Sequence, residues 1–180
     1  MPGGPTVVDY DPRWPDVFER LRRPIASALA GLRADVEHVG STAVPGLAAK
    51  PIIDIDVVVS EIRRLQQVIA RLEGVGYRHQ GDLGLAGREA FAAPPDLPEH
   101  HLYAVVRGND AHQNHVLLRD HLRSHPDAAQ RYAARKRELA DVLAHDRTAY
   151  GEAKAGIVTE LLRAAREERR RQPPASADRG

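Results

Sequence analysis

Two aspartates interrupt an apolar run between Ile52 and Val59. Asp54 and Asp56 alternate in a stretch of β-branched residues typical of a buried strand, so both side chains are expected on one face of a sheet. Two neighbouring negative charges in a buried sheet are costly unless a cation neutralises them, and Mg²⁺ prefers such oxygen ligands. The pair therefore predicts a magnesium site. The alternative, a solvated pair at an exposed strand end, is disfavoured by the apolar flanks.

A glycine and two hydroxyl residues, Gly40, Ser41 and Thr42, come shortly before this pair and directly after a short strand expected over Val36 to Val39. Glycine lets backbone N–H groups approach a phosphate without an intervening Cβ, and the serine hydroxyl adds a further hydrogen-bonding group. A strand, a turn and a neighbouring strand can bring this turn and the aspartates to one edge of a sheet. The spacing thus favours a combined phosphate and metal site.

Lysine is rare in this chain, because only Lys50, Lys136 and Lys154 among 26 basic residues are lysines. A compact ammonium suits a phosphate as a point charge, which a forked guanidinium does not imitate, although three lysines could also remain by chance. Lys136 and Lys154 each follow a tyrosine by four residues, a helical spacing that could offer a cation to a triphosphate and a ring to a base. Ordinary surface pairs are the alternative. The candidate nucleotide-binding residues also include Tyr150, Arg119 and Arg88, the last with a simple salt bridge as its alternative role.

These residues require strands and helices to position them, and the periodicity predicts both. Strands are expected over Val36 to Val39, Ile52 to Val59, Tyr77 to Asp82, Arg88 to Ala92 and His101 to Val106. Helices are expected over Asp11 to Arg33, Glu61 to Leu72, His112 to Ser124, Pro126 to His145 and Thr148 to Arg171.

The segment from Glu37 to Val57, EHVGSTAVPGLAAKPIIDIDV, resembles the signature of the GrpB family. Shorter matches extend the likeness over roughly residues 8 to 165. The resemblance implies membership of the nucleotidyltransferase superfamily and an α/β fold, a mixed β-sheet flanked by helices with a helical C-terminal third. It also implies that Mg²⁺ on Asp54 and Asp56 would bridge a triphosphate, so that AMP passes from ATP to a small-molecule hydroxyl or amine and pyrophosphate leaves.

The superfamily usually adds a third carboxylate from a later strand, and the pattern here does not identify one. His101 and Glu89 are the candidates for this position. A neutral imidazole can act as a base near pH 7, so His101 is chemically suitable, and a structural hydrogen bond is its alternative role. A non-catalytic Mg-nucleotide-binding or regulatory module therefore remains the second interpretation.

Composition limits the other possibilities. With 26 basic and 25 acidic residues the chain has no large net charge that would attract nucleic acid or membranes. It has no cysteine, which fits a reducing compartment. A cytoplasmic protein is expected, in one domain over residues 1–165, followed by a frayed helix end and disordered tail over 166–180. Nine histidines invite a zinc site at His100-His101 or at His112 and His115, but solvated or capping histidines fit better. The acceptor, the base preference and the oligomeric state are left open by the sequence.

Overall fold

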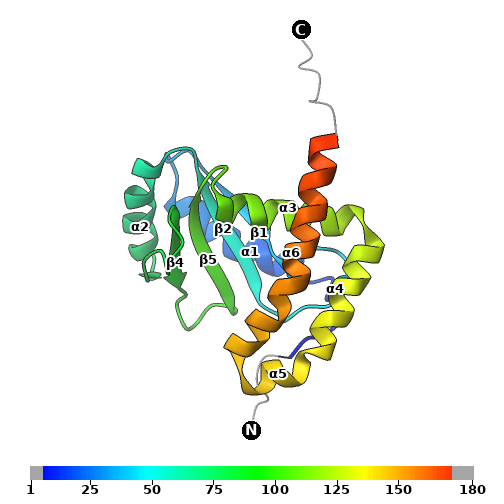
Figure 1. The fold of residues 1–180 in the computed structure, drawn as a ribbon. Coiled ribbons are helices and arrows are strands. Elements are labelled where there is room, and N and C mark those ends of the chain that lie inside the picture. Colours follow the sequence, from blue (N-terminus) through cyan, green and yellow to red (C-terminus); the bar gives the residue numbers. More distant parts are fainter. Residues whose placement is uncertain (1–5, 172–180) are drawn as a thin grey trace.

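The computed structural model describes residues 6–171, which form a mixed five-stranded sheet with helices on both faces. The strand order is β1-β2-β5-β4-β3 (Figure 1). β2 pairs in parallel with β5, whereas every other pairing is antiparallel. The strands are β1 (Ala34–Val39), β2 (Ile53–Val59), β3 (Arg78–His79), β4 (Arg88–Ala92) and β5 (His100–Val106).

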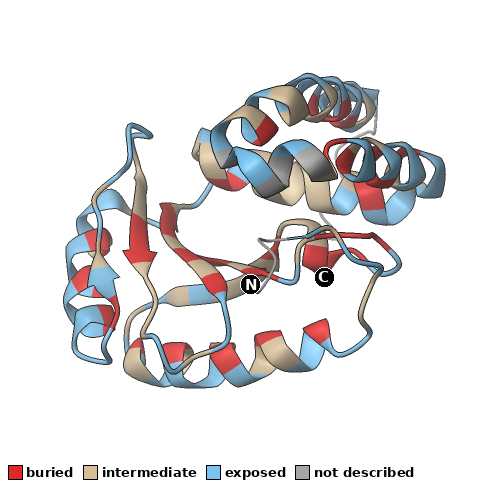
Figure 2. Ribbon diagram, turned by 90° about the horizontal axis from the view of Figure 1, so that it is seen from below, coloured by how far each residue is buried: buried red, intermediate tan, exposed pale blue. Residues whose placement is uncertain are grey.

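One face of the sheet is apolar and is covered by α1 (Trp14–Ala28) and α2 (Leu65–Glu73). Figure 2 shows the sheet between this layer and the later helices. Ile55 and Val57 of β2 and Leu102 of β5 are buried in this main core. Since strand side chains alternate, the polar residues between them point to the opposite face, where the C-terminal helices lie.

The C-terminal third is helical, as expected, and packs beside the second face of the sheet (Figure 1). A second hydrophobic cluster joins these helices to the connection between β1 and β2 through Val44, Leu47, Leu122, Tyr132 and Leu161. The helices are α3 (Asp110–Ser124), α4 (Pro126–Glu138), α5 (Ala140–His145) and α6 (Arg147–Arg171). The predicted fold class, a mixed sheet with flanking helices and a helical C-terminal third, is confirmed.

Some predicted boundaries were wrong. The single helix expected over Pro126 to His145 is divided into α4 and α5 at Leu139, whose ψ of 5° is not helical and whose side chain packs on Tyr150. The strand expected over Tyr77 to Asp82 reduces to the two residues of β3, because Gly81 turns the chain with a positive φ. α6 continues to Arg171, and the rest of the expected tail lies outside the described residues.

Two shorter elements, the 3₁₀ turns η1 (Ser41–Ala43) and η2 (Ile62–Arg64), complete the described chain. None of the helices between residues 6 and 171 is long and apolar enough to cross a membrane.

Candidate active site

Asp54 and Asp56 lie on the face of β2 that looks toward α3. Asp54 is opposite His101 of β5, and Asp56 is opposite Tyr103 of the same strand. The Asp56 side chain is fully buried, whereas that of Asp54 is 31% exposed. A solvated strand end therefore does not describe this pair, because at least one carboxylate is removed from water.

A histidine contacts each aspartate. His101 Nδ1 lies 2.7 Å from Asp54 Oδ1, and His115 Nδ1, from α3, lies 2.8 Å from Asp56 Oδ2. Burial alone would lower the pKa of His115, but the hydrogen bond to Asp56 and the charges of both aspartates outweigh it and raise the pKa. The raised pKa favours the charged form of His115, which partly neutralises the buried Asp56.

The turn at Gly40 fits closely against Asp54. Gly40 has a φ of +72°, a conformation that favours glycine, and a Cβ built there would lie 2.1 Å from Asp54 Oδ2. Only glycine therefore allows this carboxylate to lie against the turn. The Gly-Ser turn and the predicted metal ligand Asp54 are therefore in direct contact.

The chain's three lysines converge on one pocket of about 170 Å³ beside this turn. Lys50 comes from the β1–β2 connection, Lys136 from α4 and Lys154 from α6. The ammonium groups of Lys50 and Lys154 lie 4.6 and 5.5 Å from the centre of the Tyr150 ring. Asp54, Ser41 and His101 line the same pocket, so the lysines face the candidate metal site.

Lys136 is only 3% exposed, and its ammonium donates to Ser41 Oγ at 3.1 Å and to the carbonyl oxygen of Ala48. None of the described carboxylates forms an ion pair with it. Burial, followed by the nearby charges of Lys154 and Arg137, lowers its pKa to about 7. A buried ammonium without an anionic partner costs free energy. Its presence here indicates a binding position for an anion.

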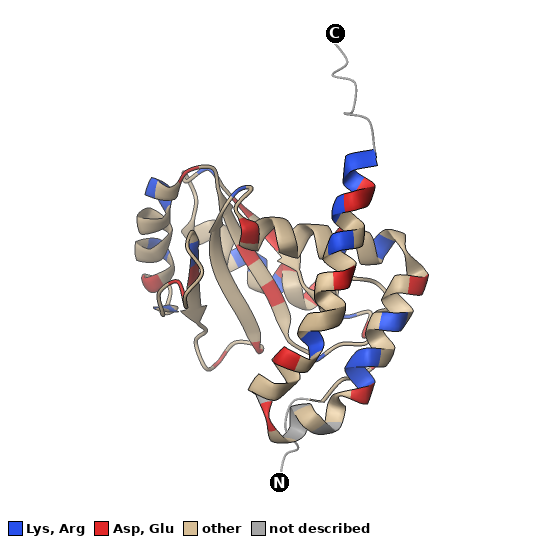
Figure 3. Ribbon diagram, viewed as in Figure 1, with Lys and Arg blue, Asp and Glu red and all other residues tan. Residues whose placement is uncertain are grey.

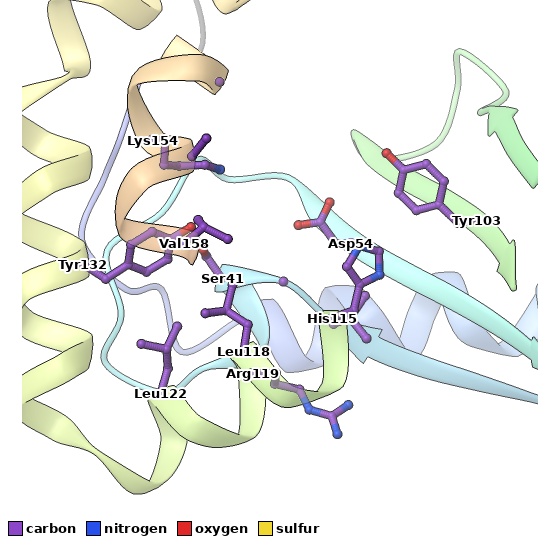
Figure 4. A pocket seen from close by; sticks show the side chains of 14 residues that line it. Ser41, Asp54, Tyr103, His115, Leu118, Arg119, Leu122, Tyr132, Lys154 and Val158 are labelled. Carbon is purple, nitrogen blue, oxygen red and sulfur yellow. The ribbon is translucent and has the colours of Figure 1, made fainter. Parts of the chain in front are cut away.

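A larger pocket of about 350 Å³ adjoins the first and shares Ser41, Asp54 and Lys154 with it. Figure 4 shows its side chains, with Lys154 and Tyr132 on one side of Asp54 and Tyr103 on the other. Burial raises the pKa of Tyr132 to about 12, although the interaction with Ser41 opposes this shift. Leu118, Leu122 and Val158 give the pocket an apolar wall between α3 and α6. A charged edge and an apolar wall suit a ligand with both phosphate and nonpolar surface.

The aspartate pair also fits a magnesium ion by its chemistry. Asp56 Oδ1 is buried without a hydrogen-bond partner among the described residues. A buried carboxylate oxygen without a hydrogen-bond partner costs free energy unless a cation coordinates it. Because Mg²⁺ prefers carboxylate oxygens, Asp54 and Asp56 are the residues that would hold it.

Three of the predicted binding residues make other contacts in the structure. The buried Thr42 hydroxyl donates to the Ile52 carbonyl at 3.3 Å and therefore supports the turn. The Arg119 guanidinium donates to the His38 carbonyl at 3.1 Å and pairs with Asp120, although its side chain lines the larger pocket. Arg88 lies on the same face of the sheet as Asp56, with its guanidinium 4.8 Å from the centre of the Tyr103 ring.

Glu89 does not reach the aspartates. It pairs with Ala104 of β5, whose side chain is in the main core, so it points to the opposite face of the sheet. There it contacts His79 at 2.6 Å. Of the two candidates for the third position, only His101 lies beside Asp54.

Glu37 of β1 lies beside the candidate site but was not among the predicted residues. Glu37 is opposite Asp56 and shares its face, where it lies 3.6 Å from His112 and 3.8 Å from Arg119. Glu37 and Val39 alternate on a strand just before Gly40, and this alternation was the sequence signal that could have identified Glu37. His115 was considered for zinc and as a solvated or capping histidine, because its pairing with Asp56, 59 positions away, leaves no local pattern.

A separate group of possible metal ligands joins α3 to α6. His121, His125 and Glu168 place ligand atoms within 4.8 Å of one another. The two imidazole rings are stacked, with centres 4.2 Å apart and planes 28° apart. Nearly parallel rings direct their nitrogen atoms along similar lines rather than toward one ion, so the group is better described as a polar contact between helices.

Together these features define an α/β protein with a mixed sheet, in which a Gly-Ser turn contacts a pair of strand aspartates. The family model described as GrpB protein matches residues 5–164, and the chain belongs to this family.

Two relatives illustrate the range of similarity within the GrpB family. UPF0157 protein SCO7215 of Streptomyces coelicolor is 37% identical, with 87% of this chain and 84% of the relative aligned. UPF0157 protein YqkA of Bacillus subtilis is 34% identical over 74% of this chain, which spans only 39% of that protein. Neither name states an activity.

The crystal structure of GrpB from Enterococcus faecalis matches 88% of this chain and 98% of its own, with a TM-score of 0.74 and 33% identity. The Cid1 poly(U) polymerase bound to MgATP aligns with 71% of this chain and 44% of its own, at a TM-score of 0.49 and 13% identity.

Proposed function

We propose that this protein is a Mg²⁺-dependent nucleotidyltransferase that moves a nucleoside monophosphate, AMP from ATP, to a small-molecule hydroxyl or amine. The observation that carries the proposal is the convergence of all three lysines on a pocket that opens onto Asp54. They come from three separate segments, and the buried Lys136 has no carboxylate partner among the described residues. A triphosphate provides the missing negative charge.

The proposed chemistry assigns a role to each group. Bound Mg²⁺ would supply charge neutralisation for the triphosphate and the pentavalent transition state. The acceptor's oxygen or nitrogen forms a bond to the α-phosphorus, the bond from this phosphorus to the bridging oxygen breaks, and pyrophosphate leaves toward the lysines. The acceptor's proton passes to a base, for which His101, oriented by Asp54, is the nearest candidate. A cytoplasmic location, where ATP and Mg²⁺ are abundant, is part of this proposal.

Two measurements test the proposal. Calorimetry should detect binding of a non-hydrolysable ATP analogue with Mg²⁺, and a pyrophosphate assay should detect release from ATP in the presence of a metabolite extract. Both Asp54→Asn and Asp56→Asn should abolish the release while leaving the circular dichroism spectrum unchanged. Release that persists in both variants would refute the proposal.

The second interpretation is a nucleotide-binding module without turnover. It is favoured by one observation, that His101 and Tyr103 stand on β5 beside the aspartates where the superfamily usually places a third carboxylate. Tight binding of Mg-nucleotide without pyrophosphate release over any acceptor would support the module. The absence of any nucleotide binding would defeat both interpretations.

A further inference from the structure

Arg88 is a cation without an anionic partner on the sheet face that carries the aspartates. It is opposite Val105, which is itself opposite Val58 of β2, so its side chain shares the face of Asp56. Its Nε is buried without a hydrogen-bond partner, and its terminal nitrogen donates only weakly, at 3.4 Å, to the Asp82 carbonyl. No described carboxylate lies within salt-bridge distance of Arg88. An arginine held in this state indicates a binding position for an external anion.

The anion at Arg88 would bind at a different place from the triphosphate. The guanidinium stacks on Tyr103, and Figure 4 places Tyr103 and Lys154 on opposite sides of Asp54. Because Tyr103 lines the larger pocket together with Asp54 and His115, the guanidinium of Arg88 lies beside that pocket.

The in-line geometry of phosphoryl transfer relates the position of Arg88 to the acceptor. Attacking and leaving atoms lie roughly in line on opposite sides of the phosphorus. If pyrophosphate leaves toward the three lysines, the acceptor enters from the side of Tyr103 and Arg88. The partnerless cation then lies on the acceptor's path.

We propose that the acceptor is a small molecule with a carboxylate or phosphate group, and that Arg88 binds this group beside Tyr103 so that the acceptor's hydroxyl or amine faces Asp54. This inference rests on the proposed nucleotidyl transfer. A small acceptor is favoured over RNA because a polynucleotide needs a series of available cations. The neighbouring Arg107 is already paired with Asp35 and Glu37.

Anion binding to the nucleotide complex provides the test. The protein is first saturated with Mg²⁺ and α,β-methylene-ATP, which occupies the lysine pocket, and inorganic phosphate or succinate is then titrated by calorimetry. We expect binding of at least one probe, weakened about tenfold or more in Arg88→Met and less in Arg88→Lys, which keeps the charge but loses the fork. Arg78→Met, which removes an exposed arginine of β3, is the matched control and should bind as the wild type does.

Each outcome has a defined meaning. Binding of phosphate alone assigns a phosphate-bearing acceptor, and binding of succinate alone assigns a carboxylate. If the analogue binds but neither anion does, or if Arg78→Met weakens binding as much as Arg88→Met, the acceptor inference fails and the proposed function stands. If the analogue itself does not bind, the proposed function fails first.

A turnover measurement complements the titration. A metabolite extract is separated on an anion exchanger, and pyrophosphate release from ATP is measured with each fraction. Release supported by the retained, anionic fraction agrees with the inference. Release supported only by the unretained fraction, or extension of a short RNA in preference to every small-molecule fraction, overturns it.

Discussion

At the scale of single residues, the site depends on close contacts between groups that the sequence lists separately. Gly40 and Asp54 are the clearest case, because the turn and the carboxylate occupy adjoining space. The glycine is required by two independent factors, its positive φ and the position of Asp54 Oδ2. A substitution can distinguish them.

Replacement of Gly40 by alanine should destabilise the protein by roughly 2 to 4 kcal/mol, since backbone strain and a clash with Asp54 add together. Gly31→Ala is the matched control, because Gly31 has a φ of +82° but no atom within 4 Å of a built Cβ. Its cost should be about 1 kcal/mol, that of the strained backbone alone. Urea denaturation measures both values. Equal losses in the two variants would show that Asp54 does not restrict position 40.

Lys136 predicts a dependence of stability on pH. Its pKa is lowered to about 7 in the folded protein, by burial first and by Lys154 and Arg137 next, while in the unfolded chain it returns to the ordinary lysine value of 10.5. Between these values the unfolded chain binds the additional proton, so this residue makes the free energy of unfolding rise with pH and makes it lowest below pH 7.

The variant Lys136→Met isolates this effect. Between pH 7 and 9 the wild type should gain stability relative to Lys136→Met, which should be the more stable of the two at pH 7 because it buries no charge. Urea denaturation at both pH values measures the difference. A difference that stays constant across this range would contradict the lowered pKa.

At the scale of elements, α3 connects the sheet to the helical third. Its His115 contacts Asp56, and Arg123 donates to the Ala43 carbonyl of the η1 turn at 2.9 and 2.6 Å. At its start, the Asn109 side chain accepts from His112 N at 2.9 Å and donates to the Gly87 carbonyl at 2.7 Å. The orientation of α3 therefore determines where His115 lies.

Substitutions of Asn109 should separate its two roles. Asn109→Ala removes the helix cap and the bond to Gly87 and should cost about 1 to 2 kcal/mol. Asn109→Asp keeps an oxygen acceptor for the cap but loses the donor, so its cost should be smaller. Chemical denaturation gives both values. If the aspartate variant is as unstable as the alanine variant, the bond to Gly87 rather than the cap holds this end of α3.

The elements differ in how far the sequence determined them. β2 was predicted to within one residue because its β-branched run is local, and β4 was predicted with its observed bounds. β3 was overestimated because the positive φ of Gly81 depends on the turn that follows. The division between α4 and α5 was missed because Leu139 leaves helical geometry to pack on Tyr150, a contact that periodicity does not reveal.

At the scale of the whole molecule, the site is assembled from segments far apart in the sequence. The bond between Lys136 and Ser41 joins residues 95 positions apart. Figure 3 shows acidic positions on the central strands and basic positions along α4 and α6. The sequence predicted roles for Asp54, Asp56 and the lysines, and Asp54 and the lysines line one pocket. The face on which Glu89 points and the pairing of His115 depend on strand register and helix packing.

This assembly predicts that a nucleotide stabilises the whole fold, since its phosphates would join the sheet, the β1–β2 connection and the helices that carry Lys136 and Lys154. A ligand at about 100 times its Kd adds roughly 2.7 kcal/mol. For a chain of this size that corresponds to a rise in Tm of about 5 to 10 °C. Thermal unfolding with Mg²⁺ and α,β-methylene-ATP measures the shift.

Two comparisons make this thermal prediction specific. AMP with Mg²⁺ lacks the β- and γ-phosphates and should raise the Tm much less, because it cannot reach across to the lysines. Lys154→Met should lose most of the shift given by the ATP analogue, since one of the cations that links α6 to the phosphates is gone. Equal shifts for AMP and the analogue would place the β- and γ-phosphates outside the lysine pocket, and the assignment of that pocket to the triphosphate would then be wrong.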